Sequence, residues 1–138
     1  MLTDPLVHAF ETASVDPQRF RHREHLYVAW CYLSALPFEE AAQRYHHHLR
    51  RLAAALGVPE KYHATITWAY LLLLAEVMAA PALAGADFET LERQAPALFD
   101  HRNGMLFDYY DRALLDSDEA RRRFILPRRR PTSSAAQS

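Results

Sequence analysis

The chain has 138 residues, which is the size of one domain. Hydrophobic residues make up 50% of it and charged residues 24%, a composition that excludes disordered and collagen-like chains. The formal net charge is only −1, and the single cysteine, Cys31, excludes an internal disulfide framework. We therefore expect a globular protein of a reducing compartment.

Apolar residues recur at spacings of three and four, which predicts helices and no strands. Glycine, proline and aspartate residues mark the helix ends. We expect helices over residues 4–14, 20–35, 38–56, 60–79, 87–100 and 105–115, and a short last turn that begins at Ser117. The predicted fold class is all-α: a compact single-domain bundle of five to six helices over residues 1–126.

Two of these segments carry further predictions. The segment 60–79 is apolar on all sides, which is typical of a central helix. Pro96 interrupts the pattern of segment 87–100 and predicts a kink or a break. The longest apolar run, Ala64 to Ala75, is about 12 residues long, short of the roughly 20 that span a bilayer. The first residues also lack the pattern of a secretion signal, so we expect a cytoplasmic protein without a membrane partner.

The end of the chain is basic. Residues 119–138 hold six arginines and one glutamate, whereas the rest of the chain is acidic. From residue 127 onward the Arg, Pro and Ser composition predicts a disordered tail. A basic tail can bind nucleic acid or fold back on an acidic body. We favour the second interpretation and do not expect a nucleic-acid partner.

Eight histidines are the unusual feature of the composition. Three of them, His46, His47 and His48, are consecutive, and on a helix their rings point about 200° apart in total, so they cannot close on one ion. We expect these three on a solvated or boundary face, and we expect His8 and His101 at the surface as well.

The remaining three histidines continue apolar stripes. His22 and His25 are three residues apart and therefore neighbours on one helix face, an arrangement that allows two rings to share an ion. His63 opens the segment 60–79 on the face that also carries Thr67. Short connections make the second, third and fourth helices antiparallel in turn, so the starts of the second and fourth lie at the same end.

The sequence thus predicts a site at one end of the bundle. His22, His25 and His63 are its expected metal ligands, and zinc or iron is the expected divalent transition metal, with an open position for a small-molecule substrate. His63 and Thr67 are the expected catalytic residues. The groups expected to support them from outside the ligand set are Tyr62, Tyr70 and Tyr110. The leading hypothesis is a small metal-dependent enzyme, either hydrolytic or oxygen-dependent.

Other hypotheses stay open. The same histidines and tyrosines could line a metal-free pocket for a small organic ligand. The protein could instead be a non-catalytic interaction module that uses its exposed helix faces and arginine tail. Each histidine could also be a core residue paired with a carbonyl, a tyrosine or a threonine.

Two motifs resemble those of a group of small, uncharacterised bacterial all-helical proteins. The first, F-x-H-x-x-H-L-x-x-A-W, is carried by Phe20, His22, His25, Leu26, Ala29 and Trp30. The second, Y-H-x-T-I-T, is carried by Tyr62, His63, Thr65, Ile66 and Thr67. The similarity spans most of residues 20–127. It implies an all-helical fold and no particular activity or substrate.

Overall fold

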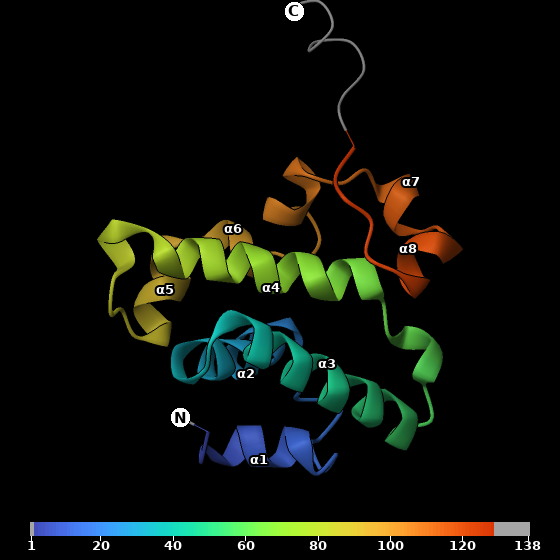
Figure 1. The fold of residues 1–138 in the computed structure, drawn as a ribbon, viewed down its shortest axis with the longest axis horizontal. Helices are drawn as coiled ribbons and strands as arrows, with labels where there is room; N and C mark the ends of the chain where they lie inside the picture. The colour runs from blue at the N-terminus through green and yellow to red at the C-terminus, as the bar shows by residue number, and fades with distance from the viewer. Residues whose placement is uncertain (1, 129–138) are drawn as a thin grey trace, which may run out of the picture.

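The computed structural model describes residues 2–128, and its regular elements there are all helical, so the predicted all-α class is confirmed (Figure 1). The α-helices are α1 (Pro5–Glu11), α2 (His22–Ala35), α3 (Phe38–Ala55), α4 (Ala64–Ala79), α5 (Phe88–Gln94), α6 (Pro96–Phe99), α7 (Arg112–Leu115) and α8 (Asp118–Arg122). Three short 3₁₀ helices join them: η1 (Pro59–Lys61), η2 (Pro81–Leu83) and η3 (Met105–Asp108). No helix of the described residues is long and apolar enough to span a bilayer.

The predicted helices 4–14, 20–35 and 38–56 coincide with α1, α2 and α3 except for a few terminal residues. The prediction 60–79 is wrong at its start, because the backbone is extended at His63, which caps α4 instead of belonging to it. The prediction 87–100 divides into α5 and α6 at Ala95, the residue before Pro96, and this confirms the expected break. The prediction 105–115 divides into η3 and α7.

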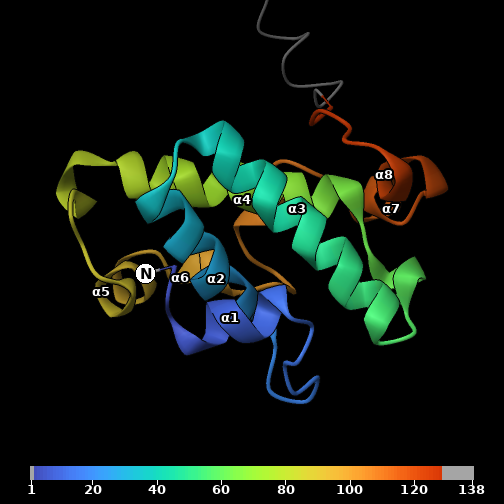
Figure 2. The same cartoon turned by 60° about the horizontal axis from the view of Figure 1, so that its bottom comes forward.

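The long helix α4 lies in the middle of the molecule (Figure 1). It contacts α2 and α3 on one side and α6, η3 and α8 on the other. Figure 2 shows α1 packed beneath α2 and α3, on the side away from α4. The position of α4 confirms the expectation from its all-round apolar pattern.

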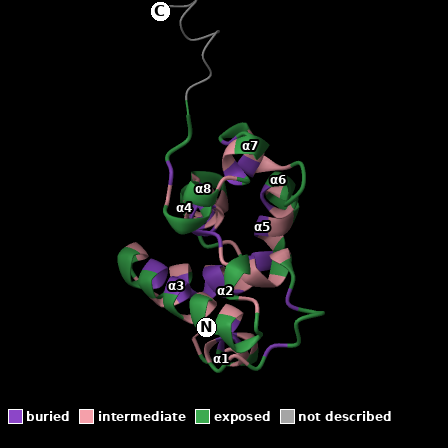
Figure 3. Ribbon diagram, turned by 90° about the vertical axis from the view of Figure 1, so that its right-hand side faces the viewer, coloured by how far each residue is buried: buried purple, intermediate pink, exposed green. Residues whose placement is uncertain are grey.

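The core has two parts. The larger joins α1, α2, α3, α4, α5 and α6 through fully buried residues such as Phe10, Val28, Tyr32 and Leu71. The smaller lies between α4, η3 and α7 and contains Leu106 and Leu115. Figure 3 shows that the buried residues face neighbouring helices and the exposed ones face outward. Each fully buried apolar side chain of this size stabilises the fold by roughly 1.5–3 kcal/mol.

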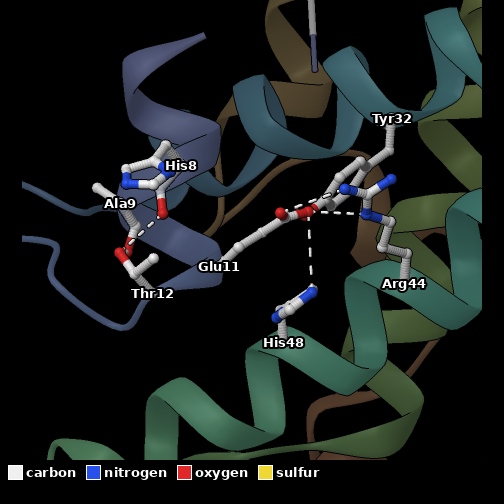
Figure 4. Close-up of polar contacts among 7 residues, drawn as sticks. All are labelled: His8, Ala9, Glu11, Thr12, Tyr32, Arg44 and His48. Carbon is white, nitrogen blue, oxygen red and sulfur yellow. Dashed lines mark hydrogen bonds and ion pairs between the residues drawn. The ribbon is translucent and has the colours of Figure 1, made fainter. Parts of the chain in front are cut away.

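A polar cluster ties α1 to α2 and α3 (Figure 4). Arg44 on α3 donates from Nε to Glu11 Oε2 (2.8 Å) and from a terminal nitrogen to Oε1 (3.2 Å). The hydroxyl of Tyr32 on α2 donates to the same Glu11 Oε2 (2.5 Å). Burial alone would raise the pKa of Glu11, but the hydrogen bonds from Arg44 and Tyr32 outweigh it and lower the pKa. Glu11 is therefore ionised, and its carboxylate links α1 to α2 and α3.

The segment after α8 is held against α4 by one buried threonine. The Thr65 hydroxyl donates to the carbonyl of Arg123 (2.8 Å) and accepts from the amide of Ile125 (3.1 Å). The Tyr110 hydroxyl donates to the carbonyl of Ile125 (2.6 Å). These bonds satisfy backbone groups of an extended segment that pairs with no strand within residues 2–128. Most of the tail predicted over 127–138 lies outside the described residues.

Candidate functional site

A cavity of about 890 Å³ lies between α2, α3, η1, α4 and the segment 99–107. Sites for small molecules typically enclose about 300–1,000 Å³ and are mostly apolar, with a few placed polar groups. Three helices supply most of the apolar wall, which includes Leu26, Ala29, Leu49, Leu52, Ile66 and Leu71. We take this cavity as the candidate functional site.

His22 is the first residue of α2 and lines the cavity. Its Nε2 lies 3.1 Å from the carbonyl oxygen of Leu98. Because a carbonyl only accepts, Nε2 carries the hydrogen and Nδ1 is left as an acceptor. The ring packs against the rings of Tyr70 and His101, with centroids 4.6 and 5.3 Å away. Burial lowers the pKa of His22 more than the Leu98 carbonyl raises it, so the ring is neutral at pH 7.

His25 lies one turn further along α2 and also lines the cavity. Its Nδ1 is 3.2 Å from the hydroxyl oxygen of the buried Tyr45. This is the only hydrogen bond of that hydroxyl within residues 2–128, and it forms with either tautomer of the ring: the hydroxyl donates to a bare Nδ1, or a protonated Nδ1 donates to the hydroxyl oxygen. Burial, and then the neighbouring His22, lower the pKa of His25 to about 4.

His63 uses both ring nitrogens to hold backbone. Nδ1 accepts from the amide of Ile66 (3.1 Å) and so caps α4. Nε2 donates to the carbonyl of Leu115 (2.6 Å), which ties α4 to the end of α7. The Thr67 hydroxyl donates to the carbonyl oxygen of His63 (2.7 Å) and thus contacts the main chain instead of the ring. Burial lowers the pKa of His63, so it is a neutral structural link.

The three predicted histidines therefore line one cavity, as do Thr67, Tyr62 and Tyr70. Within residues 2–128, however, no group of three or more His, Cys, Asp or Glu side chains lies in an arrangement that could hold a metal ion. The nitrogens of His63 are both occupied by backbone. The zinc or iron centre and its catalytic use stay predictions that this geometry does not support.

Tyr110 is not part of the cavity lining, because its hydroxyl holds the C-terminal segment. The expectation of a boundary position is wrong for His46, which is buried under α4 with its ring 4.3 Å from that of Trp68. Its Nδ1 donates to the carbonyl of Ala42 (2.8 Å). The expectation is correct for His47, which is exposed. A helical wheel of α3 alone does not show that α4 also packs on α3 and covers the side that carries His46.

The sequence pattern did not indicate two residues of the site. His101 follows α6 in a turn, and the expectation of an exposed residue is correct, yet its ring lies beside that of His22. The turn approaches α6 closely at Gly104, where a Cβ would collide with the carbonyl oxygens of Ala97 and Asp100. In the sequence, Tyr45 belongs to the apolar stripe of α3. Its contact with His25 depends on how α3 packs against α2 and is seen only in the structure.

Comparisons of this chain with protein-family models, with curated proteins and with solved structures found no match. The cavity and the groups that line it are therefore the basis for any statement about function.

Proposed function

We propose that the protein binds a small organic molecule in the cavity between α2, α3 and α4. The observation that carries the proposal is the volume of about 890 Å³ within a chain of 138 residues. The space is a cleft that is partly open to solvent. Its volume, mostly apolar walls and few polar groups match those of small-molecule sites.

The polar groups at the cavity support the same function. His22 presents an Nδ1 lone pair, His25 contacts the Tyr45 hydroxyl through Nδ1, and both rings are neutral at pH 7. Contacts with Tyr45 and Leu98 fix the two rings before any ligand arrives. Such fixed groups orient a ligand without the cost of ordering side chains on binding.

The exposed apolar side chains do not favour the alternative of a protein-interaction module. The large ones within residues 2–128 are Leu56, Leu72, Tyr109 and Leu126. They belong to different parts of the chain: the end of α3, α4, the residue after η3, and the segment after α8. Singly scattered residues of this kind are normal on a monomer surface.

A neutral fluorescent probe tests the proposal. N-phenylnaphthylamine fluoresces strongly when its rings leave water, and we expect saturable one-to-one binding to the wild-type protein. Ala53 on α3 lines the cavity, whereas its neighbour Ala54 is exposed and does not. Ala53→Phe fills space in the cavity and should weaken binding at least about tenfold, equal to about 1.4 kcal/mol. Ala54→Phe should leave it unchanged.

The matched pair separates binding in the cavity from binding at the surface. Thermal unfolding monitored by circular dichroism confirms that both variants fold. If both bind the probe as wild type does, or if the wild-type protein shows no saturable binding, the cavity is not a binding site for apolar molecules and the proposal is wrong.

A further inference from the structure

The charged side chains that line the cavity all have one sign. They are Arg21, Arg23, Lys61 and Arg102, and no aspartate or glutamate of residues 2–128 lines the cavity. The whole chain has 17 acidic and 16 basic residues. A lining with four cations and no carboxylate therefore departs from the balance of the rest of the molecule.

Three of these cations have no ion-pair partner. Arg23 donates to Glu92 Oε2 at 2.9 Å, but Arg21, Lys61 and Arg102 form no salt bridge with any residue of the described chain. All three are exposed, which places them at the rim of the cavity. They come from three separate segments: the residue before α2, η1, and the turn after α6.

The carboxylates nearest in sequence are occupied elsewhere. Glu24 Oε1 accepts from the backbone amide of Arg21 (2.9 Å). Asp100 Oδ1 accepts from the backbone amides of Arg102 (3.1 Å) and Asn103 (3.0 Å). Both acids stabilise turns, and the backbone amides of Asn103 and Arg102, followed by the charges of His101 and Arg102, lower the pKa of Asp100. Arg21 Nε donates to the carbonyl of Gln18 (3.0 Å), which leaves its charge uncompensated. Within residues 2–128 the rim cations thus have no ion-pair partner.

The wall behind the rim carries neutral polar groups. His22 presents an Nδ1 acceptor, and the His25 ring contacts the Tyr45 hydroxyl through Nδ1. The Tyr70 side chain lines the cavity, and its buried hydroxyl has no hydrogen-bond partner in the described residues. The preference for an anion therefore comes from the rim, where arginine and lysine side chains form stronger, charge-assisted hydrogen bonds with an anionic oxygen group than with a neutral one.

We infer that the natural ligand is an amphipathic organic acid. Its anionic group lies at the rim near Arg21, Lys61 and Arg102, and its apolar body lies between α2, α3 and α4. This inference rests on the proposed function and adds the chemical class of the ligand. Rim cations of this kind also attract an anion before it docks, so the association rate falls as salt increases.

Two probes with the same rings test the charge. Anilinonaphthalene sulfonate carries an anionic group that N-phenylnaphthylamine lacks. In the rim variant, Arg21, Lys61 and Arg102 are all changed to Gln. In the matched control, the exposed residues Arg51, Arg93 and Arg128, none of which lines the cavity, are changed to Gln. Both variants lose three positive charges.

We expect the rim variant to bind the sulfonate about tenfold more weakly than wild type, because it lacks three cations that each form a weak, exposed ion pair with the sulfonate. Its affinity for the neutral probe should stay within about twofold. The control variant should change neither affinity by more than about twofold. Added salt should weaken the sulfonate complex of the wild-type protein and leave that of the rim variant almost unchanged.

The outcomes distinguish the two claims. If the rim and control variants lose the same sulfonate affinity, or if neither loses any, the inference of an anionic ligand is wrong. The proposed function still holds in that case if binding of the neutral probe is weakened by Ala53→Phe. If neither probe responds to Ala53→Phe, both claims are wrong.

Discussion

Tyr70 and Tyr32 are two inward-facing tyrosines, and only the hydroxyl of Tyr32 has a hydrogen-bond partner within residues 2–128. Replacement by phenylalanine should therefore raise the free energy of unfolding at Tyr70 and lower it at Tyr32. The Tyr70 hydroxyl is buried and has no hydrogen-bond partner within residues 2–128. Burial, and then the charge of Asp100, raise its pKa to about 12, so it is a neutral donor at pH 7. The Tyr32 hydroxyl is equally hidden but donates to the Glu11 carboxylate at 2.5 Å.

The magnitudes follow from what each hydroxyl loses on folding. An unpaired buried polar group costs about 1–3 kcal/mol. Tyr70→Phe removes that cost and should raise the free energy of unfolding of the ligand-free protein by about 1 kcal/mol, because some hydration of the cavity wall reduces the gain. Tyr32→Phe leaves a carboxylate without one donor and should lower the free energy of unfolding by about 1.5–3 kcal/mol.

Urea unfolding at pH 7, followed by far-ultraviolet circular dichroism, gives both values from the midpoint and slope of each curve. A Tyr70→Phe variant that is less stable than wild type by more than about 1 kcal/mol would refute the reasoning, since the hydroxyl would then be paired in the folded protein. Equal effects of the two substitutions would refute it as well.

Three further results are expected. Burial lowers the pKa of His25 to about 4 in the folded protein, whereas the unfolded chain has the ordinary value of 6.5. Between these two pH values only the unfolded chain binds the proton, so the free energy of unfolding falls on acidification by up to about 1.4 kcal/mol per pH unit. His25→Gln should remove this part of the pH dependence, as measured by urea unfolding at several pH values. Thr65→Val removes two hydrogen bonds to the segment after α8; it should cost about 1–3 kcal/mol and speed amide exchange at Ile125, and unchanged exchange would contradict the role of Thr65. His63→Ala removes the cap of α4 and should lower the free energy of unfolding by about 1–2 kcal/mol. Elemental analysis of untagged protein should give the same metal content for this variant and for wild type. Stoichiometric zinc or iron that is present in wild type and lost in the variant would instead support the predicted three-histidine centre.

The helices were predictable because their signals are local. Apolar spacing of three and four does not depend on distant residues, and neither does the break before Pro96. The all-round apolar pattern of α4 likewise predicted its central position, which its contacts on two sides confirm. The inward position of His22 and His25 followed from the same periodicity, and both residues line the cavity.

The content of the site was less predictable because it depends on contacts across long sequence distances. The bond from His63 to the carbonyl of Leu115 spans 52 positions, and the bond from His22 to that of Leu98 spans 76. No local pattern distinguishes a histidine that binds a ligand from one that holds a distant carbonyl. His101 belongs to a turn without periodicity, so only the packing of that turn against α6 brings it to His22.

The central claim is that the cavity takes an amphipathic organic anion. It is tested most directly by a crystal structure of the wild-type protein with anilinonaphthalene sulfonate. We predict that the rings lie between α2, α3 and α4 and that the sulfonate lies within ion-pair distance of Arg21, Lys61 or Arg102. Rings bound outside the cavity, or a sulfonate that points away from these three side chains, would contradict the account.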